Sequence, residues 1–159
     1  MAGAKCERVD LSPADVFLKR LQERINEIPK ENRRLLVVIA GHNGAGKTTF
    51  YKERLEAAIG TMLDAHINAD DIERAISADL GQGSHSKEDL EGIAAAEATR
   101  LRRQYLEQDV SFSFETVFSD QVMDKVHFIE DARQRGYLVV LLAVGLKSIG
   151  KSKERVAIR

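Results

Sequence analysis

The sequence has little of several features that mark other classes of protein. Its 159 residues include one cysteine, Cys6, and no tryptophan. A single cysteine cannot form an internal disulfide, and no apolar run approaches the roughly 20 residues that a membrane span needs. The first ten residues, MAGAKCERVD, also lack the apolar core of a signal peptide. We therefore expect a protein of the reducing cytoplasm with no membrane partner, and a chain of 159 residues is long enough for one globular domain.

An excess of charge of either sign is also missing. The chain has 24 basic and 25 acidic residues, a formal net charge of -1 and a pI of about 6.4. No overall field therefore attracts it to nucleic acid or to anionic lipid. Only 6% of the residues are aromatic, which disfavours the stacking platforms that bind single strands. We expect no nucleic-acid partner.

The apolar residues alternate between two periodicities along the chain. Continuous runs at 35–40 (LLVVIA) and 137–146 (YLVVLLAVGL) predict strands buried on both faces, and the alternating VSFSFE at 110–115 predicts another. A weaker strand is expected at 62–68, and helices at 12–28, 47–59, 70–77 and 86–108, with a further helix that Ser119 and Asp120 cap and Gly136 ends. Strands that alternate with helices predict an α/β fold with a mainly parallel sheet.

Residues 41–48, GHNGAGKT, lie where the first strand ends and a helix begins. They satisfy G-x-x-x-x-G-K-[ST], the phosphate-binding P-loop. Its glycines let successive backbone N–H groups point into one concavity at the positive end of the helix. Lys47 is expected to reach the β- and γ-phosphates of ATP, and the Thr48 hydroxyl to ligate Mg²⁺. The residues expected to bind the nucleotide are Gly41, His42, Asn43, Gly44, Ala45, Gly46, Lys47, Thr48 and Thr49, of which His42 occupies a variable position of the motif.

Three classes of P-loop protein compete for this motif: a mechanical ATPase, a switch GTPase and a small-molecule kinase. The chain contains neither the N-K-x-D guanine-reading motif nor L-S-G-G-Q, and the strand at 137–146 ends without an acidic residue. A kinase is therefore favoured. Its reaction needs a carboxylate that orients the acceptor hydroxyl, and Asp70 and Glu115 both follow predicted strands. Asp70 is equally explained as a helix N-cap, whereas Glu115 has little structural use unless a ligand, a metal-bound water or a basic residue meets it.

The same segments resemble the zeta-toxin family. The likeness runs in unbroken order through GHNGAGKTTF, INADDIERA, EATRLRRQYL, SFSFETVFS and GYLVVLLAVGL. That family comprises P-loop kinases related to UDP-N-acetylglucosamine kinase toxins, so the resemblance implies a three-layer P-loop NTPase fold. It implies that the ATP γ-phosphate passes to a hydroxyl of a UDP-amino sugar, with Lys47 and Asp70 catalytic and Asp70 acting as the base. It further implies that Asp70, Glu115 and Thr116 bind the sugar nucleotide, that ATP and Mg²⁺ are the cofactors, and that a small antitoxin is a partner.

The resemblance also divides the chain and exposes one departure. Residues 1–34 form a predicted N-terminal helical extension, and residues 35–159 the kinase domain. Related chains continue past an RVAIR-like segment into a lid with arginines and a further strand, so the fold is expected to be incomplete at the C-terminus. Arg155 and Arg159 are the remaining candidate lid arginines. The apolar strand at 137–146 would then form an exposed sheet edge, through which the chain could self-associate.

Two alternatives to the toxin-type kinase stay open. One is a catalytically impaired nucleotide-binding remnant or an antitoxin-binding decoy, and the other is a kinase of another small hydroxyl compound. Arg100, Arg102 and Arg103 are candidates to face a phosphate-bearing ligand, although their spacing is more typical of a solvated helix face paired with Glu97 and Glu107. His66, His85 and His127 have no metal-ligand spacing, so no zinc site is expected.

Overall fold

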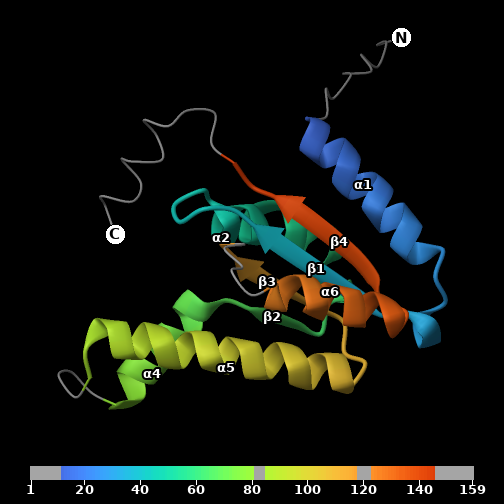
Figure 1. The fold of residues 1–159 in the computed structure, drawn as a ribbon. Coiled ribbons are helices and arrows are strands. Elements are labelled where there is room, and N and C mark those ends of the chain that lie inside the picture. The colour runs from blue at the N-terminus through green and yellow to red at the C-terminus, as the bar shows by residue number, and fades with distance from the viewer. Residues whose placement is uncertain (1–11, 81–84, 118–122, 146–159) are drawn as a thin grey trace, which may run out of the picture.

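The computed structural model describes residues 12–80, 85–117 and 123–145. These residues form a four-stranded parallel sheet in the order β2-β3-β1-β4 (Figure 1). Its strands are β1 (Leu35–Ala40), β2 (Ala65–Ile67), β3 (Phe112–Thr116) and β4 (Leu138–Ala143). The helices are α1 (Pro13–Asn26), α2 (Lys47–Phe50), α3 (Glu56–Ile59), α4 (Ala69–Leu80), α5 (Lys87–Glu107) and α6 (Asp124–Gln134), with a π-helical turn at Tyr51–Leu55 and 3-10 turns at Lys30–Asn32 and Gly60–Met62.

Helices cover both faces of the sheet, which makes the three layers predicted from the sequence. Alternate β1 residues point to opposite faces because side chains in a strand alternate. On one face Val37 packs with α1 and with the helical run 47–59, and on the other Val38 packs with α5 and α6. Both valines are fully buried. The two cores together account for the uninterrupted apolar run of β1.

The alternating sequence of β3 divides its side chains between these two faces. Phe112 and Phe114 lie in the core beneath α5 and α6. Ser113 and Glu115 point to the other face, since they are in register with Val37 and Ile39 of β1. That face is covered by the helical run 47–59. Polar side chains are therefore buried directly beneath the helix that follows the P-loop.

The structure confirms most of the predicted elements and shifts some of their ends. Ser12 caps α1 in a capping box with Asp15, as its place before Pro13 predicted. The strand expected at 62–68 is shorter because Gly60–Met62 forms a 3-10 turn. The expected caps Ser119 and Asp120 lie outside the described residues, as do Arg155 and Arg159. Within the described ranges, no helix combines the length and apolar character needed to cross a membrane.

The strand β4 is at one edge of the described sheet, next to β1. Figure 1 shows α1 lying beside β4, and Val140 packs into the core that α1 shares. Leu141, which points the other way, is 56% exposed. The N-terminal helix thus covers one face of the predicted edge strand, and self-association through this edge stays a prediction.

Gly41 gives a test of the packing between the P-loop and β4. A Cβ at this position would overlap the carbonyl oxygen of Val144, whose own N–H donates to Ala40 O at 2.7 Å. We expect Gly41→Ala to lower the free energy of unfolding by about 1–3 kcal/mol, since overpacking forces backbone shifts. Gly92→Ala is the matched control, because nothing lies within 4 Å of a Cβ on that helical glycine. It should raise stability by about 0.5–1 kcal/mol in urea unfolding. Equal effects of the two substitutions would contradict the close packing.

Candidate functional site

The P-loop connects β1 to the helical run 47–59 through two glycines in left-handed conformations. Gly44 has a φ of 78° and Gly46, the N-cap of α2, a φ of 93°. Residues with a side chain rarely adopt these backbone angles, so glycine is favoured at both positions. The Ala45 N–H donates to His42 O at 3.1 Å, which closes the turn. The loop therefore wraps the start of the helix, where backbone N–H groups and the helix dipole favour an anion.

The Lys47 side chain folds back over the same loop. Its Nζ donates to the carbonyl oxygens of Gly41 at 2.9 Å and His42 at 3.2 Å. The ammonium is thereby held beside the loop that the motif assigns to phosphate.

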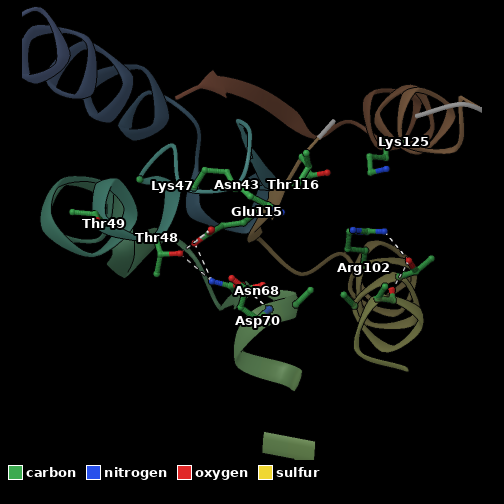
Figure 2. A pocket seen from close by; sticks show the side chains of 17 residues that line it. Asn43, Lys47, Thr48, Thr49, Asn68, Asp70, Arg102, Glu115, Thr116 and Lys125 are labelled. Carbon is green, nitrogen blue, oxygen red and sulfur yellow. Dashed lines mark hydrogen bonds between the residues drawn. The ribbon is translucent and has the colours of Figure 1, made fainter. Parts of the chain in front are cut away.

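Thr48, Glu115 and Asn68 form a hydrogen-bonded cluster beside the P-loop (Figure 2). The Thr48 hydroxyl donates to Glu115 Oε2 at 2.9 Å. The Asn68 amide donates to Thr48 Oγ1 and to Glu115 Oε1, each at 3.2 Å. The Glu115 side chain is only 6% exposed, and each of its carboxylate oxygens accepts one of these hydrogen bonds. The sequence indicated a ligand, a metal-bound water or a basic residue beside this carboxylate, and the hydrogen-bond partners found are two neutral polar groups, Thr48 of α2 and Asn68 just before α4.

Asn68 also caps α4, which settles the alternative explanation of Asp70. The Asn68 side-chain oxygen accepts the Asp70 N–H at 2.9 Å, and its backbone oxygen accepts the N–H groups of Asp71 and Ile72. The N-cap role that was equally open for Asp70 therefore belongs to Asn68. Asp70 lies in the first turn of α4 and lines the cavity described next.

A cavity of about 530 Å³ joins these groups to α5 and α6. The P-loop and Asp70 lie on one side, and Arg102 and Lys125 on the opposite side (Figure 2). The Arg102 guanidinium lies 4.9 Å from the centre of the Phe114 ring and donates to Thr99 Oγ1 at 2.8 Å. Burial lowers the pKa of Arg102, while the nearby Asp124 carboxylate partly offsets this. The cavity therefore has a cationic group at each end.

The neighbouring arginines of α5 point elsewhere. Arg100 pairs with Glu97 at 2.7 Å on the solvent side, as the helical spacing predicted. Arg103 bonds Asp124 of α6 at 3.0 Å. Of these three candidates, Arg102 lines the cavity.

The cavity brings together most of the predicted site residues. Those that line it are Asn43, Gly44, Gly46, Lys47, Thr48, Thr49, Asp70, Glu115 and Thr116. Three predicted nucleotide-binding residues lie outside its lining: Gly41 packs under β4, Ala45 is 4% exposed in the core, and the exposed His42 ring contacts the Asn43 carbonyl oxygen at 2.8 Å.

Sequence reasoning missed Asn68 and Lys125. Asn68 directly precedes a helix that begins ADD, which is an N-cap signal, but nothing local indicated its second set of contacts. Lys125 comes to the cavity on α6, about 80 residues from the P-loop, with no motif around it. Its position follows only from the packing of α6 beside α5.

A phosphate-binding loop between a central parallel strand and a helix, with carboxylates at the same sheet edge, defines an α/β P-loop protein. The sequence model of the family described as Zeta toxin matches residues 18–159. The chain therefore belongs to the zeta toxin family.

Solved structures support the fold. A candidate kinase from Chloroflexus aurantiacus J-10-fl matches with TM-score 0.58 and 18% identity, over 79% of this chain and 66% of that one. The PezAT chromosomal toxin–antitoxin system of Streptococcus pneumoniae gives 0.53 and 17%, over 84% and 57%. The complex of AvrRxo1-ORF1 and -ORF2 with ATP gives 0.63 and 15%, over 94% and 51%.

At these identities the likeness shows a common fold. The chain spans between 51% and 66% of the lengths of these three proteins. No protein with a curated description is similar enough in sequence to count as a match.

The dual role of Asn68 predicts an unusually large cost for its removal. Asn68→Ala removes a helix cap, which is worth about 1 kcal/mol, and also the amide that bonds the buried Glu115, which adds about 1 kcal/mol. The matched control is Ser86→Ala, which removes the exposed capping box of α5 and nothing else. Urea unfolding should therefore show about 2 kcal/mol lost for Asn68→Ala and about 1 kcal/mol for Ser86→Ala. Equal losses would mean that the bonds to Thr48 and Glu115 contribute nothing to stability.

Proposed function

We propose that the protein is an ATP-dependent kinase of zeta-toxin type that transfers the γ-phosphoryl group of ATP to a hydroxyl of a UDP-amino sugar. The observation that carries the proposal is that a P-loop and the carboxylate residue Asp70 line one cavity. Family membership supports a kinase, and a solved structure of the same fold, AvrRxo1-ORF1 with its partner, contains ATP.

The P-loop half of the cavity would bind the triphosphate. The backbone N–H groups around Gly44 and Gly46 would receive phosphate oxygens, with the helix dipole adding to the attraction. Lys47 would exchange its two carbonyl partners for the β- and γ-phosphates, because a phosphate is a stronger acceptor of an ammonium than a neutral carbonyl.

The residues beside the loop fit Mg²⁺. The Thr48 hydroxyl and the Glu115 carboxylate are the hard oxygen donors that this ion prefers. Thr48 donates one hydrogen bond and accepts one, which leaves a lone pair on Oγ1 for a ligand. The described residues contain no cluster of three or more histidine, cysteine or acidic side chains, so a magnesium ion here would depend on substrate phosphates and water for its other ligands. When bound, it would neutralise charge on the phosphates.

The opposite half of the cavity would bind the acceptor. Asp70 lines the same cavity on the side of the P-loop, and its carboxylate would accept the proton of the attacking hydroxyl. Arg102 and Lys125 offer positive charge for an acceptor that carries phosphate, as a UDP-sugar does. Asp70, Glu115 and Thr116, which all line the cavity, are the proposed contacts to the sugar nucleotide.

Further parts of the proposal concern the setting of the protein. The solved PezAT structure belongs to a toxin–antitoxin system, which supports a small antitoxin as a partner for this chain. We also propose a cytoplasmic location, a kinase domain at 35–159 preceded by the helical extension 1–34, and self-association through the β4 edge.

Two substitutions separate nucleotide binding from phosphoryl transfer. Asp70→Asn should retain ATP affinity and reduce turnover of UDP-N-acetylglucosamine by about 10²–10⁴-fold, the usual contribution of a general base. Lys47→Ala should weaken ATP binding itself. Asp71→Asn is the matched control for Asp70, because Asp71 pairs with Arg74 on the same turn. Isothermal titration with Mg-ATP and a phosphorylation assay over a panel of UDP-sugars measure these effects. ATP binding without turnover of any acceptor by the wild type would instead favour a catalytically impaired remnant or decoy.

Two of the three arginines of α5 test the acceptor half of the cavity. Arg102→Ala should raise the KM for the UDP-sugar by about tenfold, the effect expected from one lost bond to a charged group, and leave ATP affinity unchanged. Arg100→Ala, on the solvent face of the same helix, should change neither. If both variants behaved alike in steady-state assays, the cationic end of the cavity would have no part in acceptor binding.

A further inference from the structure

A buried aromatic and polar cluster lies beneath the P-loop helix, outside the cavity lining. Tyr51 begins the π-helical turn of the helical run 47–59, and its ring stacks on that of His66 from β2. The ring centres are 3.6 Å apart and the planes differ by 9°. Ser113 of β3, fully buried, lies on the same face. Single π turns inside helices occur often at functional sites, and here one places Tyr51 directly against His66.

The two nitrogens of His66 face different groups. Nδ1 lies 2.8 Å from the Ser113 hydroxyl oxygen, within hydrogen-bond distance. Nε2 lies 3.4 Å from Glu115 Oε1. Among the described residues, Nε2 is one of two buried side-chain nitrogens or oxygens that make no hydrogen bond. A buried polar atom in this state is rare in folded proteins and calls for an explanation from its surroundings.

The partners decide which nitrogen carries the proton. An ionised carboxylate only accepts hydrogen bonds, so the nitrogen that faces Glu115 is the one that bears hydrogen. Nδ1 then accepts from the Ser113 hydroxyl. The surroundings are dry enough that burial raises the pKa of the Tyr51 phenol, to which the Glu56 and Glu115 carboxylates add and which the Ser113 hydroxyl opposes. An N–H group and a carboxylate that lie 3.4 Å apart attract each other more strongly in such surroundings than in water.

We propose that His66 is a positioning residue that acts through Glu115. Its Nε2–H orients the carboxylate that accepts the Thr48 hydroxyl and the Asn68 amide, and so fixes the Thr48 oxygen for magnesium-bound ATP. This role rests on the proposed function, since it concerns the same nucleotide site. The chain of contacts runs from Ser113 through His66 and Glu115 to Thr48, and it joins β2, β3 and the P-loop helix.

Packing on Tyr51 would not by itself require a histidine. A phenylalanine would stack on the Tyr51 ring and avoid the cost of burying two ring nitrogens. The imidazole therefore fits a requirement for polar atoms that face Ser113 on one side and Glu115 on the other. Groups that orient a ligand-binding side chain from behind commonly change ligand affinity 10- to 100-fold when they are replaced, as they do around metal sites.

Three substitutions at His66 distinguish the contribution of the ring from the contributions of Nδ1 and Nε2. His66→Phe keeps a planar ring over Tyr51 and removes both nitrogens. The amide of His66→Gln reaches about as far as Nε2 and can donate to Glu115, whereas that of His66→Asn reaches only as far as Nδ1. His127→Gln, at an exposed position on α6, is the matched control. For each variant, ATP affinity is measured by isothermal titration with Mg²⁺ and again with EDTA.

We expect Mg²⁺ to strengthen ATP binding by the wild type and by His127→Gln. His66→Phe and His66→Asn should lose about tenfold in affinity for Mg-ATP and leave affinity in EDTA unchanged, and His66→Gln should restore most of the loss. If His66→Phe fails to fold, the comparison between Gln and Asn decides, since both lack the ring.

Three results would overturn the role of His66. They are a magnesium effect that persists in His66→Phe, a deficit that is equal in the Gln and Asn variants, and a loss that is the same with and without Mg²⁺. A wild type that binds no Mg-ATP would overturn the nucleotide site itself, and this role with it, so the two failures are distinguishable.

Discussion

The parallel register between β1 and β3 is the constraint on which the site depends. It pairs Ile39 with Glu115 and Ala40 with Thr116, so the P-loop and the Glu115 carboxylate leave the sheet at the same edge. The Thr48 hydroxyl can then donate to Glu115 across 67 positions of sequence at 2.9 Å. A shift of one residue in β3 would turn Glu115 into the phenylalanine core and Phe114 toward the P-loop helix. Burial of Phe112 and Phe114 therefore fixes the register that places Glu115 beside the P-loop helix.

The two faces of the sheet differ in the side chains they bury: one has an apolar core around β3, and the other contains polar groups next to the P-loop helix. On the α5 and α6 face, the rings of Phe112, Phe114 and Phe128 pack within about 6.5 Å of one another and form an apolar core. On the P-loop face, Ser113, His66 and Glu115 lie against one another, and their polar contacts offset part of the cost of removing these groups from water. The resulting network ties β2, β3 and the P-loop helix together. Thr48 and Glu115 belong both to this network and to the lining of the cavity.

Much of this fold was predictable because its strongest signals are local. Local sequence specifies the strand at 35–40, the P-loop and the capped helix after Ser12. The sequence signal for β2 was weak because this strand is only three residues long. The site was predictable where a motif or a strand end marked it, as for Lys47, Thr48, Asp70 and Glu115. Helical spacing alone could not tell Arg102 from Arg100, since only the packing of α5 decides which side faces the cavity. Asn68, His66 and Lys125 act through contacts made far along the chain, and no local pattern encodes them.

The central claim is that the backbone N–H groups of the P-loop bind the triphosphate of ATP, with Lys47 moving to it. A crystal structure with Mg²⁺ and a non-hydrolysable ATP analogue tests this directly. The account predicts phosphate oxygens within hydrogen-bond distance of the N–H groups from Gly44 to Thr48, with Lys47 Nζ released from the carbonyl oxygens of Gly41 and His42. Nucleotide bound elsewhere, or Lys47 still bonded to both carbonyls beside a bound triphosphate, would contradict it.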